Sequence, residues 1–181
     1  MSVLSITGQQ LLDIIYKDVD DFSLDAGYYI TDSSYAIPDC AYIKTEVYNS
    51  FTKWLKFIGL DKKPGQKQYW HRKFDCENLA SLYKSYCDLL HYKTNPLSFT
   101  DNTTAKKKNK SDSEGLAVGT IWYDNSITPN ASLPASLHAV NAFITRKPGQ
   151  KELAVIYIEP NTGSQLSLTK KQKESIWYAK F

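Results

Sequence analysis

Apolar residues in the first half of the chain recur at the three- and four-residue spacing of amphipathic helices. This pattern predicts helices over residues 7–19, 45–58 and about 75–91. Thr7 and Asp75 stand at the starts of two of them, where side chains that accept backbone N–H groups are favoured, and Gly59 follows the second. Residues 20–40 are expected to be mostly loop, with a short strand at 27–30.

The pattern changes in the second half, where short runs rich in β-branched and aromatic residues replace the helical spacing. These runs predict strands at residues 116–123, 137–145 and 153–158. A Lys-Pro-Gly turn at 146–150 joins the last two, so we expect them to form an antiparallel hairpin. Residues 175–181 fit a further strand or a short helix. Helices followed by strands predict an α+β fold.

Charge and cysteine usage narrow the classes of protein that fit. The net charge of +3 is too small to indicate a nucleic-acid or membrane-surface partner by itself. No run approaches the ~20 apolar residues that span a bilayer, and the N-terminal residues do not form a signal peptide. Three cysteines without an export signal favour reduced thiols. We therefore expect a cytoplasmic protein with no membrane partner.

Cys76 is the cysteine in the most suggestive position. It follows Asp75 directly and opens the third predicted helix. The first turn of a helix offers free backbone N–H groups and the positive end of the helix dipole, both of which favour a thiolate. Cys76 is therefore a candidate nucleophile, whereas Cys40 and Cys87 are interpreted as buried structural thiols.

Two later residues could complete a site around Cys76. A nucleophilic cysteine needs an imidazole to take its proton and a polar group to hold the imidazole ring. His138 lies near the start of one predicted strand, and Glu159 directly follows the next strand, before Pro160. In an antiparallel hairpin the start of one strand lies beside the end of its neighbour. We therefore expect these two side chains to meet near Cys76.

Three short motifs in this order resemble a known family. They are Phe74-Asp75-Cys76-Glu77-Asn78-Leu79-Ala80, His138-Ala139-Val140-Asn141-Ala142 and Glu159-Pro160-Asn161-Thr162-Gly163. They resemble the papain-like superfamily, and most of all the C-terminal protease-like domain of the Marasmius oreades agglutinin family, with its related phage and bacterial proteins. Glu77-Asn78 stands where that family has an acidic pair, and Leu79 where it has an aromatic residue. The lectin portion of the family has no counterpart here.

The resemblance implies an α+β, papain-like fold, with N-terminal helices and the nucleophile helix packed on an antiparallel sheet. It implies a thiol hydrolase, a cysteine peptidase or amidase, that cleaves peptide or amide bonds in a protein or peptide substrate. The implied triad consists of Cys76, His138 and Glu159. We expect the oxyanion or substrate site to be lined by Gln68, Trp70 and Asp75. We expect no cofactor from the residues themselves. The family resemblance implies that a divalent cation such as calcium could bind.

The whole chain, residues 1–181, is interpreted as one domain of this kind. Its helical N-terminal part covers about residues 1–60 and its catalytic core about residues 61–181. Residues 101–114 are polar, rich in lysine and without periodicity, which predicts a mobile loop.

Several alternatives use the same residues or neighbouring ones. The NlpC/P60 peptidases also begin a helix with Asp-Cys, although their third residue is usually a histidine or polar residue. A transglutaminase-like acyltransferase would use the same triad. A non-catalytic phage or bacterial interaction or effector module on the same fold would use none of it.

Metal binding and nucleic-acid binding are both disfavoured. A zinc site would draw on His71, Cys76, Cys87 and His91, but residues 76 and 87 lie ~16 Å apart along a continuous helix, too far for one ion. The lysine run at 106–110 and the many aromatic residues could contact single-stranded nucleic acid, but no recognition motif supports this. The oligomeric state cannot be read from the chain.

Overall fold

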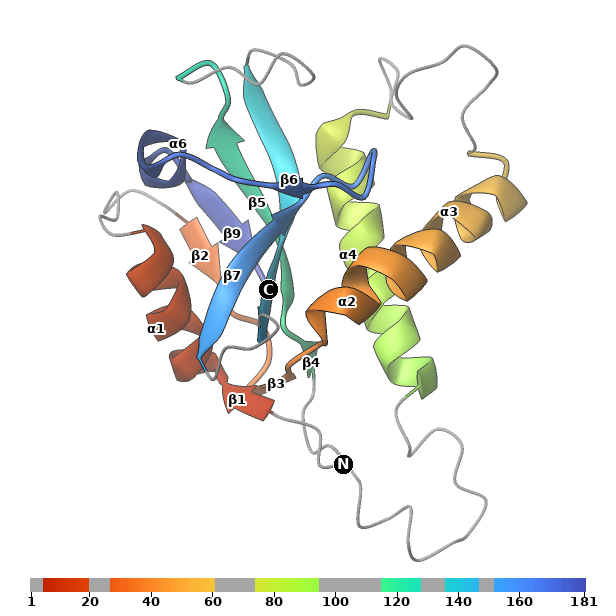
Figure 1. Ribbon diagram of the computed structural model, residues 1–181, viewed down its shortest axis with the longest axis horizontal. Coiled ribbons are helices and arrows are strands. Elements are labelled where there is room, and N and C mark those ends of the chain that lie inside the picture. Colours follow the sequence, from red (N-terminus) through yellow and green to blue (C-terminus); the bar gives the residue numbers. More distant parts are fainter. Residues whose placement is uncertain (1–4, 20–26, 61–73, 95–114, 128–135, 147–151) are drawn as a thin grey trace, which may run out of the picture.

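A computed structural model describes residues 5–19, 27–60, 74–94, 115–127, 136–146 and 152–181 of the chain. Figure 1 shows the elements in space. In chain order they are β1 (Ser5–Thr7), α1 (Gly8–Val19), β2 (Gly27–Tyr29), β3 (Ser34–Ala36), α2 (Cys40–Tyr42), the π-helix η1 (Ile43–Val47), α3 (Tyr48–Phe57), α4 (Cys76–Thr94), β4 (Gly115–Leu116), β5 (Val118–Asp124), β6 (Leu137–Arg146), β7 (Leu153–Ile158), β8 (Gln165–Leu166), α6 (Lys170–Glu174) and β9 (Tyr178–Lys180).

The strands form two sheets. The larger sheet has the order β2-β9-β5-β6-β7-β8, and the smaller one has the order β1-β3-β4. Strands β5, β6 and β7 pair antiparallel, as the predicted hairpin requires. However, β2 pairs parallel with β9, and β3 pairs parallel with β4. The α+β class is therefore confirmed, while the expected antiparallel sheet is a mixed one.

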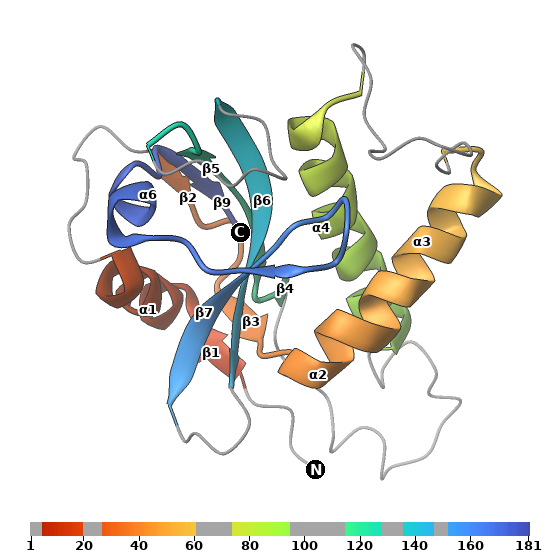
Figure 2. The ribbon, with the colours of Figure 1, turned by 45° about the horizontal axis from the view of Figure 1, so that its top comes forward.

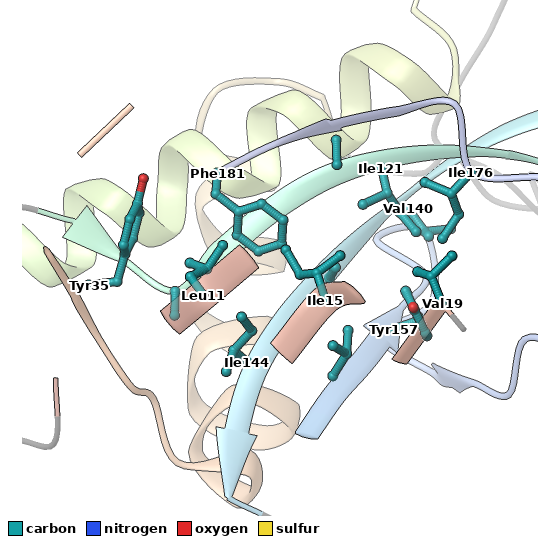
Figure 3. Packing of buried hydrophobic residues seen from close by; sticks show 14 of the residues in the cluster. Leu11, Ile15, Val19, Tyr35, Ile121, Val140, Ile144, Tyr157, Ile176 and Phe181 are labelled. Carbon is teal, nitrogen blue, oxygen red and sulfur yellow. The ribbon is translucent and has the colours of Figure 1, made fainter. Parts of the chain in front are cut away.

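Helices cover both faces of the larger sheet. Helix α1 lies on one side, and α3 and α4 lie on the other (Figures 1 and 2). On the α1 side, Leu11, Ile15 and Val19 recur at four-residue steps and pack against strand residues such as Ile144 and Tyr157 (Figure 3). This periodicity is the reason why the first predicted helix forms and why its apolar stripe is buried.

The second core lies between the sheet and helices α3 and α4. It includes Phe51 and Leu55 from α3 and Leu79 and Tyr83 from α4, and all four side chains are 0% exposed. Phe143 of β6 faces this core, whereas its neighbours in the strand face α1. Successive strand residues point to opposite faces, so β6 contributes to both cores and is buried along nearly its whole length.

The two helices whose capping residue was identified from the sequence, Thr7 and Asp75, begin within one residue of the predicted start. Thr7 accepts a hydrogen bond from the Gln10 backbone N–H at 3.2 Å, and Gln10 Oε1 accepts one from Thr7 N at 2.9 Å. The second helical segment starts at Cys40, five residues before the predicted start, because the Asp39 carboxylate accepts from Tyr42 N at 2.9 Å. A π-helical turn then joins α2 to α3, which sequence periodicity does not reveal.

The predictions on membrane spans, domain organisation, location and the 101–114 loop have different outcomes. None of the helices in the described residues is long and apolar enough to cross a membrane. The single-domain organisation and the cytoplasmic location stay predictions. The predicted mobile loop at 101–114 lies outside the described residues.

Candidate functional site

Helix α4 places Cys76 at its first position. The Asp75 carboxylate accepts a hydrogen bond from Asn78 N at 3.3 Å, and Asn78 Oδ1 accepts one from Asp75 N at 3.2 Å. This reciprocal pair fixes the start of the helix, as a capping box does. Leu79, one turn further along, is fully buried and anchors the helix to the sheet. The Cys76 thiol is partly exposed, so it lies at the edge of the core where a ligand can reach it.

His138 and Glu159 meet beside this thiol. His138 is the second residue of β6, and Glu159 directly follows β7, as the hairpin predicts. His138 Nε2 lies 2.7 Å from Glu159 Oε2, and both residues are 1% exposed. Since Glu159 uses Nε2, the nitrogen of the ring that can face the Cys76 thiol is Nδ1. A short contact between two buried polar groups fixes the imidazole orientation.

The surroundings of His138 favour its charged form. Burial lowers the pKa of its imidazole, but hydrogen bonds to the side chains of Cys76 and Glu159, together with the charges of these two groups, outweigh burial and raise the pKa to about 9. At neutral pH the imidazole is therefore protonated. A protonated imidazole next to a thiol and a carboxylate can balance a negative charge on either of them.

A tight turn holds Glu159 in place. Its Oε1 accepts a hydrogen bond from Asn161 N at 2.9 Å, and its backbone oxygen accepts one from Gly163 N at 2.8 Å. Gly163 has a φ of +72°, a left-handed conformation that glycine adopts without steric cost. A Cβ at this position would also lie 2.4 Å from Cδ1 of Tyr48. Both the conformation and the close approach explain a glycine here.

The structure adds neighbours that sequence reasoning missed. Tyr123 is directly opposite His138 in the β5–β6 ladder, and their ring centroids are 6.0 Å apart at an interplanar angle of 78°. Asn141, also on β6 and fully buried, donates through Nδ2 to the Ala80 backbone oxygen of α4 at 2.9 Å. Tyr123 can be recognised as a neighbour of the site only from the strand register, and Asn141 only from the packing of α4 on β6.

The remaining predicted site residues have different outcomes. Asp75 is exposed and caps α4, and a role for it in lining a ligand site stays a prediction. Gln68, Trp70 and the His71 of the zinc alternative lie outside the described residues. Within the described part of the chain, no group of three or more His, Cys, Asp or Glu side chains could hold a metal ion. Calcium binding stays a prediction.

Comparison with known proteins identifies related folds. No family model matches the chain, and no curated protein matches it significantly. Among solved structures, it is similar to a PSL1a–E64 complex, with 18% identity, 98% of this chain covered and a TM-score of 0.61. It is also similar to Polyporus squamosus lectin bound to the human-type influenza-binding epitope Neu5Aca2-6Galb1-4GlcNAc, with 18% identity, 98% coverage and a TM-score of 0.59. The chain spans 50% of the length of each.

These neighbours confirm the agglutinin side of the predicted resemblance and contradict its peptidase side. At this identity they show a shared fold, which is the fold of fungal lectin chains. One of these structures is a lectin bound to a carbohydrate epitope, and neither supports peptide hydrolysis by this fold. The prediction of a thiol hydrolase, and with it that of a cysteine protease working through a catalytic triad, is corrected on this ground. The predicted protein or peptide substrate has no support from these structures.

Proposed function

We propose that this chain is a ligand-binding domain whose site is the group formed by Cys76, His138 and Glu159. The observation that carries the proposal is the buried 2.7 Å contact between His138 Nε2 and Glu159 Oε2 beside a helix-start thiol. Burying a charged pair costs desolvation energy, so a protein that needed only stability would gain as much from apolar residues. The pair is better explained by what it does to the thiol.

The site would hold a ligand through the Cys76 sulfur. An imidazolium at His138 stabilises the thiolate, and the Glu159 carboxylate keeps the imidazole oriented and positive. The thiolate adds to an electrophilic carbon of the ligand, an S–C bond forms, and the displaced electron pair moves to the neighbouring ligand atom. His138 returns a proton to that atom. The step ends with a bound ligand, and no hydrolysis is part of the proposal.

The proposal includes a papain-like arrangement of the α+β fold. In a papain-like arrangement, a helix that begins with cysteine packs on a sheet whose strand carries the histidine. The packing of α4 on β6, through Asn141 and the Ala80 backbone oxygen, supports such an arrangement.

Alkylation of the three cysteines tests the proposal. We expect iodoacetamide at neutral pH to modify Cys76 faster than Cys40 and Cys87, with the rates measured by peptide mass spectrometry. Because Cys76 is also the most exposed of the three, the matched control is His138→Gln, which leaves the exposure of the thiol in place. An equal Cys76 rate in wild type and His138→Gln would show that exposure alone explains the labelling, and the proposal would fail.

E64 offers a second, independent probe, because a PSL1a chain of this fold forms a complex with it. We expect E64 to bind to the wild-type chain and not to Cys76→Ala, as measured by intact mass and by calorimetry. Binding that is unchanged in Cys76→Ala would place the E64 site elsewhere and count against the thiol site.

Carbohydrate binding is a second candidate function, favoured by an aromatic surface on the larger sheet. This surface consists of Tyr29, Trp122, Trp177 and Tyr178 on and beside β2, β5 and β9. Trp122 lies 4.9 Å from Trp177 and 5.5 Å from Tyr178, between ring centroids, and Tyr29 and Trp177 are 55% and 39% exposed. Exposed aromatic rings offer flat apolar faces with polar edges, which suit the C–H face of a sugar ring.

The trisaccharide bound by the Polyporus squamosus lectin is the natural probe for this surface. We expect saturation-transfer NMR to detect its binding to the wild-type chain and a loss of the signal in Trp177→Ala. Tyr42→Ala is the matched control, because Tyr42 is 42% exposed and lies outside the aromatic surface. Absence of transfer in wild type, or equal transfer in both variants, would exclude this role for the surface.

A further inference from the structure

A cavity of about 130 Å³ lies at the far end of α4 from Cys76. Its walls come from α2 and η1 on one side, from α4 on another, and from β3, β4 and β6 beneath. The wall is apolar apart from a few atoms, and it includes Ile43, Val47, Leu90 and Phe143. The exposed residue Tyr42 also lines the cavity, which is partly open to the surface, so a small molecule can enter it.

The polar groups of this cavity are few and specific. His91 lines it, and His91 Nε2 is buried and has no hydrogen-bond partner among the described residues. The Cys87 thiol also lines it and is 0% exposed, and burial raises the pKa of this thiol, so it stays protonated. A buried polar atom without a partner costs about 1–3 kcal/mol, which a bound ligand with a matching group would recover.

Two further features mark the cavity as more than a packing defect. The residues Ile43 and Val47 belong to the π-helical turn η1, a conformation that is rare and frequent at functional sites. His91 and Leu116 also line a neighbouring, more polar hollow with Asp32, Lys84 and Asp88. The apolar cavity therefore meets a polar hollow at His91.

We propose that this cavity is a binding site for a small apolar molecule carrying one hydroxyl group, an aryl or short alkyl alcohol, with the hydroxyl on His91 Nε2. A cavity of about 150 Å³ lined by aliphatic and aromatic side chains accommodates one benzene ring, so the volume here fits a single ring or a chain of about six carbons. A hydroxyl both donates and accepts, and so pairs with an imidazole nitrogen in either tautomer. The ring occupies the space bounded by Leu90 and Phe143, and the hydroxyl points toward the polar hollow. This site is distinct from the thiol site and does not depend on it.

Phenol and toluene are the probes for this proposal. We expect phenol to raise the melting temperature of the wild-type chain, with a dissociation constant measured by titration. His91→Leu keeps the cavity apolar and removes the nitrogen, so phenol should bind about fivefold more weakly to it. Toluene should bind wild type and His91→Leu alike, which makes it the matched control. Ala36→Leu places three more carbons in the wall and should abolish binding of both.

A direct measurement on the wild-type chain protects the test against a variant that fails to fold. Isotope-filtered NOEs should connect the ring protons of phenol with the side chains of Leu90 and Phe143. Absence of these NOEs at saturating phenol, or phenol affinity that is the same in wild type and His91→Leu, would overturn the proposal.

Discussion

Replacement of Glu159 by glutamine should remove much of the pH dependence of folding stability that His138 confers. Glutamine has nearly the same shape, and its side-chain oxygen can still accept from Asn161 N, but it carries no charge. The change therefore removes the partner charge 2.7 Å from His138 Nε2 and leaves the turn in place.

The magnitude follows from the pKa of His138. It is about 9 in the folded protein, against 6.5 for an unperturbed histidine. This difference corresponds to about 3 kcal/mol of stability. Because the folded-state pKa is raised, the contribution is complete below pH 6.5 and is lost as the pH rises through 9. Tyr123, which packs against the ring, stays neutral in this range, because burial and the charges of Glu159 and Cys76 raise its pKa.

Urea unfolding at pH 6 and pH 9.5 provides the assay. The free energy of unfolding of wild type should fall by about 3 kcal/mol between the two pH values through His138, and that of Glu159→Gln by less than half as much, because only the Cys76 interaction is then left to oppose the effect of burial on the imidazole pKa. NMR titration of His138 should give a pKa near 9 in wild type and a lower one in the variant. His91→Gln is the control and should keep the full pH dependence. If wild type is equally stable at both pH values, or if the variant keeps the wild-type dependence, the charged His138 pair is refuted.

Two further predictions concern the frame around the site. Gly163→Ala should destabilise the fold more than Gly59→Ala. Both glycines have a positive φ, but only at Gly163 would a Cβ lie within 2.4 Å of Tyr48. Urea unfolding should show a cost of about 1 kcal/mol for Gly59→Ala and a larger one for Gly163→Ala, and equal costs would contradict the close approach. Asn141→Ala should cost about 1–3 kcal/mol by the same measurement, because the backbone oxygens of Ala80 and Gly119 lose the hydrogen bonds that Asn141 Nδ2 donates in the buried layer between α4 and the sheet. An unchanged stability would show that these hydrogen bonds are dispensable.

The sequence predicts the parts of the fold that depend on local pattern. The apolar stripe of Leu11, Ile14 and Ile15 predicts α1 and most of its buried face, and the apolar runs predict β6 and β7 with their hairpin. The same hairpin geometry explains why His138 and Glu159 could be expected to meet. Periodicity and turn chemistry are sufficient for these features because they act over a few residues.

Features that join distant segments could not be predicted in this way. Strand β2 pairs with β9 across about 150 residues, and nothing in either three-residue strand specifies the parallel partner. Tyr123 faces His138 only because of the β5–β6 register, which the spacing of the two runs does not determine. The cavity at His91 depends on the π-helical turn, whose extra residue per turn leaves no mark in the apolar pattern. The peptidase function was wrong because it rested on a family resemblance, and a fold can carry different functions.

The central position of β6 affects how long the site formed by Cys76, His138 and Glu159 stays intact as the protein fluctuates. Both faces of this strand are covered, and β5 pairs with its residues 137–143 while β7 pairs with its residues 141–146, so both edges are paired over residues 141–143. Its amide protons should therefore exchange with solvent only when both layers of helices come away together, at the slow limit of exchange for the molecule. His138 lies three residues before this doubly paired stretch and is paired to Tyr123 of β5 alone, so the imidazole is anchored to the slowest-opening part of the sheet through one neighbouring strand.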